Sequence, residues 1–172
     1  MYDQIWNVLL SAVSVFNDPT TQVNVLFSII EKNGYNTSYN TIENSDFTQT
    51  VIRNLCLIMI GQTIPDCEFT SSDDAKALQD KATKVFDCEI ANTTNTNLFS
   101  YLNSLLAEIQ NDLTTRGYAL PDLITYTTKS NLPACVVCQD YYQDATRDDE
   151  IILRNVPEHP LFMPDTLEIL SQ

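Results

Sequence analysis

Over the first 120 residues, apolar positions recur at the three- and four-residue spacing of α-helices. The pattern predicts five helices, over residues 1–16, 19–33, 46–63, 72–91 and 98–117. Their apolar stripes are Ile5, Leu9, Val13 and Phe16; Val23, Leu26, Phe27 and Ile30; Val51, Leu55, Ile58 and Met59; Ala75, Leu78, Ala82, Val85, Phe86 and Ile90; and Leu98, Tyr101, Leu102, Leu105, Leu106, Ile109 and Leu113. The wide stripe of the third helix predicts that it is the most buried element.

Polar residues and prolines mark the ends of these helices. Asn17-Asp18-Pro19 ends the first helix and caps the second, with proline in the first helical position. Gly34 follows Asn33 as a left-handed stop, Pro65 ends the third helix and Gly117 ends the fifth. Ser71-Ser72-Asp73-Asp74 resembles an N-cap with acidic residues in the first turn, where the helix dipole favours them. The polar stretch 34–45 reads as a loop or linker.

The last 50 residues change character. A β-branched run at 123–128 predicts a strand, residues 132–142 and 147–155 predict two short helices, and 167–170 predicts a closing strand. This βααβ order resembles the LysM module. We therefore expect a mainly α (α+β) fold, with a helical bundle over residues 1–120 and a small βααβ LysM-like module over 121–172.

Composition narrows the classes of function. The 172 residues include 9 Lys+Arg and 23 Asp+Glu, a formal net charge of −14. Binding to nucleic acid by phosphate neutralisation needs a basic surface, and docking on an anionic membrane needs basic residues, so we expect neither partner. Only three glycines are present, and they are too far apart for a phosphate-binding loop. The longest apolar run, Leu55–Ile60, is far too short to span a bilayer.

The N-terminal apolar run carries Asp3 and no preceding Lys or Arg, unlike a secretory signal peptide. Five cysteines, an odd number, then indicate free buried thiols in a reducing compartment. Cys135 and Cys138 form a CxxC pair, for which packing in a helix is the favoured interpretation, and zinc binding and redox chemistry are the alternatives. We expect no metal and no cofactor.

Two further groups could carry chemistry. Acidic residues between 140 and 150 read as helix caps or solvated charges, although a paired-carboxylate hydrolase is an alternative. His159, the one histidine, lies between two prolines and would have to be the base of any Ser-His or Cys-His site. A structural or partner-contact histidine is the favoured interpretation. Exposed aromatic residues are expected in loops or short elements at Tyr35, Tyr39, Tyr141, Tyr142 and Phe162. Interfaces are enriched in such residues, but Tyr141 and Tyr142 are expected to close the C-terminal core.

An ordered series of short motifs runs through the C-terminal half. The matching residues are Leu132, Pro133 and Ala134; Tyr142; Asp144, Ala145 and Arg147; Arg154 and Asn155; His159, Pro160, Phe162 and Pro164; and Leu167, Glu168 and Leu170. Upstream, Asp73-Asp74-Ala75 and the stretch 112–117 also fit. Over roughly residues 50–172 the chain resembles the C-terminal region of the DNA circularisation protein family of Mu-like contractile-tailed phages.

The resemblance implies a structural adaptor in the baseplate hub of a phage tail rather than an enzyme. Its implied partners are other tail and baseplate proteins, with several copies around the hub, and its implied location is the virion, after a period in the host cytoplasm. The residues implied as partner contacts, or as the lock that holds the module together, are Arg147, Arg154, Asn155, His159, Pro160 and Phe162. Two other hypotheses stay open: a peptidoglycan-binding module, which the βααβ order allows, and a hydrolase using His159 or paired carboxylates.

Overall fold

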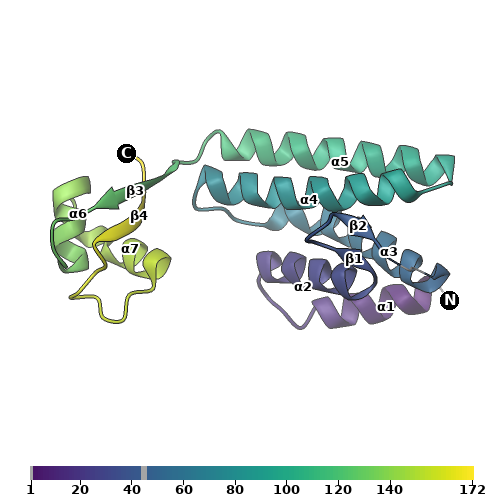
Figure 1. Ribbon diagram of the computed structural model, residues 1–172, viewed down its shortest axis with the longest axis horizontal. Coiled ribbons are helices and arrows are strands. Elements are labelled where there is room, and N and C mark those ends of the chain that lie inside the picture. The colour runs from purple at the N-terminus through teal and green to yellow at the C-terminus, as the bar shows by residue number, and fades with distance from the viewer. Residues whose placement is uncertain (1, 44–45) are drawn as a thin grey trace. The chain divides into compact units, whose positions relative to one another are not determined.

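The computed structural model describes residues 2–43 and 46–172 (Figure 1). Of these residues 64% are helical, and the remainder includes two small antiparallel sheets, which confirms the mainly α (α+β) fold. The helices are α1 (Tyr2–Val13), α2 (Pro19–Lys32), α3 (Phe47–Thr63), α4 (Ser72–Asn92), α5 (Thr96–Gly117), α6 (Ala134–Tyr142) and α7 (Asp148–Asn155), with 3₁₀ turns at Ile64–Asp66 and Ala145–Arg147. The strands are β1 (Tyr35–Asn36), β2 (Thr41–Ile42), β3 (Leu123–Thr127) and β4 (Thr166–Leu170).

The chain divides into two compact units, each with its own apolar core. The first unit runs through Phe69 and then from Asp74 to Tyr118, and the second comprises Thr70–Asp73 and Ala119–Gln172. The sequence placed the boundary after residue 120. The short segment Thr70–Asp73, which lies within the helical region, packs with the second unit.

The first unit is a helical bundle around α3. This helix contacts α1, α2 and α5, and its side chains Cys56, Leu57 and Ile60 are fully buried. Helices α4 and α5 lie side by side (Figure 1), linked by a hydrogen bond of 3.0 Å from the amide of Gln110 to the hydroxyl of Thr83. The central, buried position of α3 follows from its wide apolar stripe.

Helix starts follow the capping rules. The Asp18 carboxylate accepts a hydrogen bond from the Thr21 N–H and Pro19 opens α2. Asp46 and Gln49 form a reciprocal capping box at the start of α3. Hydrogen bonds from Thr21 also lower the pKa of Asp18, because they stabilise the charged carboxylate.

The three glycines serve different purposes. Gly34 has a φ of +98° and ends the α2 region as predicted. Helix α5 ends at Gly117 without a left-handed turn. A Cβ added to Gly117 would lie 3.5 Å from the Cβ of Ala75. At Gly61 a Cβ would lie 2.6 Å from Cδ1 of Leu105. The lack of a side chain at Gly61 therefore lets α3 and α5 pack closely.

The polar stretch after α2 is more ordered than a plain loop. Strands β1 and β2 pair antiparallel, with Tyr35 opposite Ile42. Tyr35, expected to be exposed, is only 6% exposed, so that expectation is wrong. Its ring packs in the core of the first unit while its hydroxyl donates to Oδ1 of Asn40 at 2.8 Å. Residues 44 and 45, which belong to the predicted loop, lie outside the described residues.

A buried ion pair crosses the first unit. Arg53 on α3 and Glu89 on α4 are both almost completely buried, and the guanidinium Nε is bonded to the Glu89 carboxylate. Nη1 of Arg53 also donates to the Asn33 carbonyl at 2.6 Å. The guanidinium therefore ties the C-terminal end of α2 to α3 and α4.

The second unit has the predicted order β3, α6, α7, β4. Strands β3 and β4 pair antiparallel, from Leu123 opposite Leu170 to Thr127 opposite Thr166. The core between this sheet and the two helices comprises Ala134, Val137, Cys138, Ile151, Met163, Leu167 and Ile169. Tyr141 and Tyr142 pack against the same core. None of the described helices combines the length and the apolar character needed to cross a lipid bilayer.

Candidate functional site

The predicted contact residues all lie in α7, the 3₁₀ turn before it and the turn between α7 and β4. We call "the frame" the side chains of Tyr142, Arg147, Glu150 and Asn155, together with the backbone of Pro160 and Met163. These groups have partners within the second unit and fix its shape. "The turn surface" means the side chains of Leu153, Val156, His159, Leu161 and Phe162, which are exposed.

Asn155, at the C-terminal end of α7, hydrogen-bonds to the backbone of β4. Its Nδ2 donates to the Glu168 carbonyl at 2.8 Å, and its Oδ1 accepts from the Glu168 N–H at 2.8 Å. Nδ2 also reaches the carbonyl of Ile151 at 3.0 Å. One side-chain amide therefore joins the end of α7 to the strand.

Tyr142, at the end of α6, makes a similar pair of bonds further along β4. Its hydroxyl donates to the Leu170 carbonyl and accepts from the Leu170 N–H, both at 2.9 Å. The Arg147 guanidinium lies 3.8 Å from the centre of the Tyr142 ring, a cation–π contact, and donates to Oε2 of Glu150 at 2.7 Å. Burial raises the pKa of the Tyr142 phenol to about 12, because a buried phenolate would lose its hydration.

Arg154 has a different role. Its Nη2 donates to the Thr70 hydroxyl at 2.5 Å, so it connects α7 to the Thr70–Asp73 segment. That segment precedes α7 by more than 70 residues in sequence and belongs to the same unit. Arg154 thus helps hold the second unit together.

The backbone of the turn that contains His159 is pinned to the start of α6. The Pro160 carbonyl accepts from the Ala134 N–H at 2.9 Å, and the Met163 N–H donates to the Leu132 carbonyl at 3.0 Å. Within the turn, Nδ1 of His159 accepts from the Leu161 N–H at 3.1 Å, and the imidazole lies 6.0 Å from the Phe162 ring. Among the described residues, the imidazole thus contacts the Leu161 N–H and the Phe162 ring, and it contacts no Ser, Cys or Asp nucleophile.

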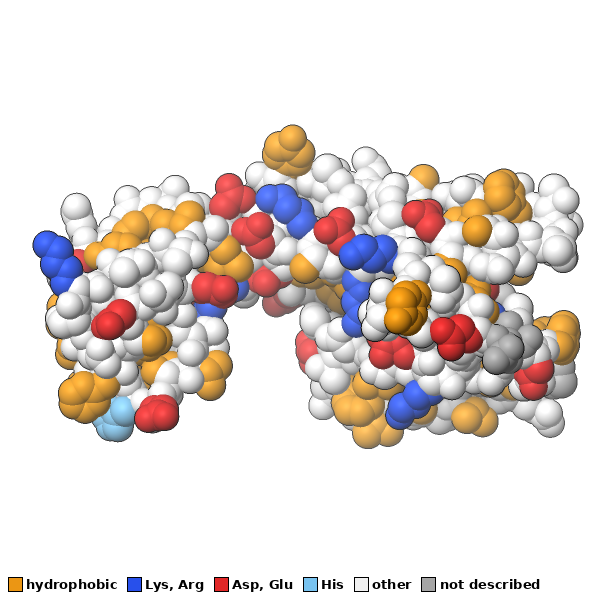
Figure 2. Space-filling model, viewed as in Figure 1, with side chains coloured by type: hydrophobic (Ala, Val, Ile, Leu, Met, Phe, Trp, Pro, Cys, Tyr) orange, Lys and Arg blue, Asp and Glu red, His pale blue; other side chains and the backbone are white. Residues whose placement is uncertain are grey.

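The turn surface is apolar. The exposed fractions are 79% for Leu153, 81% for Val156, 55% for Leu161 and 65% for Phe162. Figure 2 shows hydrophobic side chains and an acidic side chain close to the pale blue histidine of the second unit. Large apolar side chains held in water by a fixed backbone are typical of a surface that binds another molecule.

Val156 is held in an unusual backbone conformation. Its φ is +41° and its ψ is +55°, the left-handed region that a β-branched residue rarely adopts. Pro157 follows it and disfavours the helical conformation at the residue before proline, so α7 cannot continue. The Val156 N–H still bonds to the Ile152 carbonyl at 2.9 Å, which closes the last turn of the helix.

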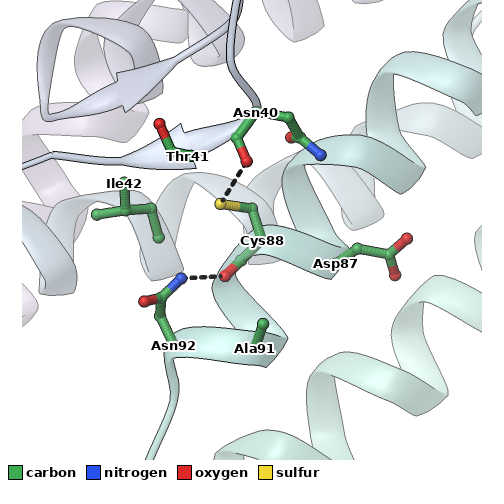
Figure 3. Close-up of a pocket in the computed structure, with 7 residues that line it drawn as sticks. All are labelled: Asn40, Thr41, Ile42, Asp87, Cys88, Ala91 and Asn92. Atoms are coloured by element: carbon green, nitrogen blue, oxygen red, sulfur yellow. Dashed lines mark hydrogen bonds between the residues drawn. The ribbon is translucent and has the colours of Figure 1, made fainter.

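A separate hollow of about 370 Å³ lies in the first unit between the β1–β2 hairpin and α4 (Figure 3). Cys88 donates through Sγ to the Asn40 carbonyl at 3.6 Å, and Nδ2 of Asn92 donates to the Cys88 carbonyl at 2.7 Å. Burial raises the pKa of the Cys88 thiol, and the Asp87 carboxylate extends away from the thiol. The hollow is open and its polar groups are largely committed to each other.

The CxxC pair divides between core and surface. Cys138 is buried in the second core, and burial raises its pKa to about 11, whereas Cys135 is exposed. The expectation that all five cysteines are buried is therefore wrong for Cys135, which lies on the outer face of α6. In the described ranges no group of three or more His, Cys, Asp and Glu side chains could hold a metal ion.

The acidic residues before and in α7 act mainly as caps. Asp144 accepts from the Thr146 N–H at 3.0 Å and from its hydroxyl, and these bonds lower the pKa of the Asp144 carboxyl. Asp148, Asp149 and Glu150 occupy the first turn of α7, where the helix dipole favours negative charge.

Sequence reasoning missed one member of the turn surface, Leu153, whose exposure depends on how α7 is turned toward the core. Val156 and Leu161 lie in the turn between Asn155 and Phe162 that the sequence indicated, but they were not singled out. The sequence signal for Val156 is its position before Pro157. The comparisons with known proteins add no relatives, since no family model and no curated protein matches the chain.

Proposed function

We propose that the chain is a structural adaptor of a phage contractile tail, in the baseplate hub region, where it links tube or spike components to the surrounding baseplate proteins. The observation that carries this proposal is the turn surface, an exposed apolar set on a backbone that the frame holds rigid. A rigid apolar surface lowers the entropic cost of binding a protein partner. An adaptor needs such surfaces and needs no catalytic group.

The motifs of the family resemblance divide between frame and turn surface. Asn155 and Pro160 serve the frame through the bonds to Glu168 and Ala134, while the imidazole of His159 and the ring of Phe162 lie on the turn surface. The Arg-Asn pair and the His-Pro-x-Phe-x-Pro turn thus act together, because one part holds the backbone and the other part is exposed. This division supports a role in which the motif forms a contact surface for a protein partner, not a catalytic site.

Charge indicates the chemistry of the partner. The chain has a formal net charge of −14; Glu158 lies within the sequence span of the turn surface, Asp165 follows it, and both side chains are exposed. A partner with an apolar centre and basic residues around it complements this arrangement. We therefore propose other tail and baseplate proteins as partners, with several copies around the hub, and neither nucleic acid nor membrane.

The test is incorporation into virus particles. A tagged chain carrying Leu161→Ser and Phe162→Ser together should be lost from purified particles, while the matched variant Val8→Ser, which removes another exposed apolar side chain, should be retained. Circular dichroism of the purified variants checks that both fold. Normal incorporation of the double variant would contradict the proposal.

A second candidate function is binding of peptidoglycan, which the β3-α6-α7-β4 order favours because it is the order of LysM modules. Co-sedimentation of the chain with purified peptidoglycan sacculi measures this directly. Retention that is lost in the Leu161→Ser, Phe162→Ser variant would favour this function, and absence of retention would eliminate it.

A further inference from the structure

The outer edge of β4 is closed by side chains at Glu168 and Leu170. In an antiparallel pair, successive residues direct their backbone groups alternately toward the partner strand and away from it. Both backbone groups of Glu168 are bonded to Asn155, and both of Leu170 are bonded to the Tyr142 hydroxyl. Glu168 and Leu170 therefore face away from β3, and their outward groups are satisfied.

The register identifies the groups that β3 directs outward. Leu123 is opposite Leu170 and Thr125 is opposite Glu168, so both also face away from β4, and Thr127 follows by alternation. The intervening positions face β4, as the bond of 2.8 Å from the Thr128 N–H to the Asp165 carbonyl shows. Strand β3 thus has an outer edge formed by its odd-numbered residues.

The start of this edge is covered from within the second unit. The Ser72 N–H donates to the Pro121 carbonyl at 2.9 Å, and the Leu123 N–H donates to the Asp73 carboxylate at 2.7 Å. Beyond that point, the Leu123 carbonyl and both backbone groups of Thr125 and of Thr127 have no hydrogen-bond partner among residues 2–43 and 46–172. Thr125 and Thr127 are exposed.

This open edge lacks the features that normally prevent strand pairing. Natural edge strands are protected by charged residues, proline, bulges or covering segments. The β3 sequence Leu-Ile-Thr-Tyr-Thr contains no charge and no proline, and its β-branched and aromatic residues favour an extended conformation. The same unit closes β4 at Glu168 and Leu170 with two side chains, whereas no side chain among the described residues closes β3 beyond Leu123.

We propose that β3 pairs antiparallel with β3 of a second copy of this chain, about a two-fold axis at Thr125. In this register each Thr125 N–H donates to the Thr125 carbonyl of the other copy, and each Thr127 N–H donates to the Leu123 carbonyl of the other copy. The pairing uses four of the five open groups on each strand, and the fifth, the Thr127 carbonyl, lies opposite the Leu123 N–H of the other copy. It stops at the Leu123 N–H, which Asp73 already occupies.

The side chains fit the same register. Ile124 comes to lie opposite Tyr126 of the second copy, and both residues already pack against the second core. Aromatic and β-branched side chains are favourable cross-strand neighbours, and Thr125 opposite Thr125 is a favourable polar pair on the exposed face. A second copy therefore supplies complementary side chains as well as backbone groups, and the result is a four-stranded sheet shared by two chains.

Cysteine trapping tests the register. Directly opposite residues of a hydrogen-bonded pair have Cα atoms about 5.5 Å apart, within the disulfide range. In a Cys135→Ser background, which removes the exposed thiol, we expect T125C to form disulfide-linked dimers at least about tenfold faster than T127C, since pairing raises the effective thiol concentration. The two thiols of T127C would lie roughly 13 Å apart along the strands. Equal rates, or no dimer from either variant, would overturn the proposal.

Sedimentation velocity supplies a second measurement that does not depend on a new thiol. The wild-type chain should associate as its concentration rises, and more strongly with added salt, because salt screens the repulsion between two acidic chains. Thr125→Pro removes one of the open donors without removing a β3–β4 bond, and it should keep the chain monomeric. A wild type that stays monomeric, or a Thr125→Pro variant that still dimerises, would overturn the pairing. Neither result bears on the adaptor proposal, which rests on the turn surface.

Discussion

At the scale of single residues, each unit depends on polar side chains that bond across large distances in sequence. Arg53 and Glu89 lie 36 residues apart, and Tyr142 and Leu170 lie 28 apart. Sequence patterns indicated that Tyr142 belongs to the C-terminal core, but they gave no sign of the Arg53–Glu89 pair. Periodicity identifies apolar faces, and a charged residue within a stripe reads as solvent-exposed until its partner is known.

Removing one member of the buried Arg53–Glu89 pair should strongly lower the stability of the fold. Glu89→Gln leaves the Arg53 guanidinium buried without a counter-charge, so we expect the free energy of unfolding to fall by about 3 to 5 kcal/mol. Urea denaturation measures this loss. Glu108→Gln makes the same chemical change at an exposed position and should shift the free energy by less than about 0.5 kcal/mol. Similar losses for the two variants would contradict the burial of the pair.

Because of the Tyr142 phenol, the free energy of unfolding should depend on pH in the alkaline range. Its pKa is raised from 10.0 to about 12 in the folded chain. The shift therefore stabilises the fold fully below pH 10, and this contribution is lost as pH rises through about 12. The difference in unfolding free energy between wild type and Tyr142→Phe, measured from pH 8 to 12, should shrink across that window.

The same comparison with Tyr39→Phe, which alters an exposed phenol, serves as the control. Below pH 10, Tyr142→Phe should also lose about 1 kcal/mol, because the two bonds to Leu170 are removed. A difference that stays constant up to pH 12 would show that burial does not perturb Tyr142.

At the scale of elements, the close approach of α3 and α5 depends on Gly61. Because a Cβ at this position would overlap the Leu105 side chain, Gly61→Ala should lower stability by about 1 kcal/mol. In a Leu105→Ala background the clash is gone, and the same substitution should become stabilising by up to about 1 kcal/mol, since alanine favours helix. Thermal unfolding of the four chains measures both effects. The same sign in both backgrounds would contradict the packing.

The helices were predictable because caps and apolar stripes are local signals. Asp18 and Gly34 act where the sequence placed them, and the βααβ order of the second unit is as predicted. The β1–β2 hairpin was missed because each strand has two residues, too few to show alternation. The frame was only partly predictable, since Asn155 and Tyr142 could be recognised as motif residues but their bonds to β4 depend on tertiary packing.

At the scale of the whole molecule, the two proposed contact surfaces both belong to the second unit. The second unit combines a rigid turn surface with the open edge of β3, and both are suited to protein contacts. The −14 charge favours solubility of the free chain and association with basic partners. The proposed adaptor role, with two proposed protein-binding surfaces, would account for these features together.

The most direct test of the adaptor account is the position of the chain in the assembled particle. Electron microscopy of contractile-tailed particles that carry a gold-labelled tag on this chain measures that position. The account predicts label at the baseplate end of the tail, in several copies around its axis. Particles that are complete and infectious but carry no label, or label confined to the head, would contradict it.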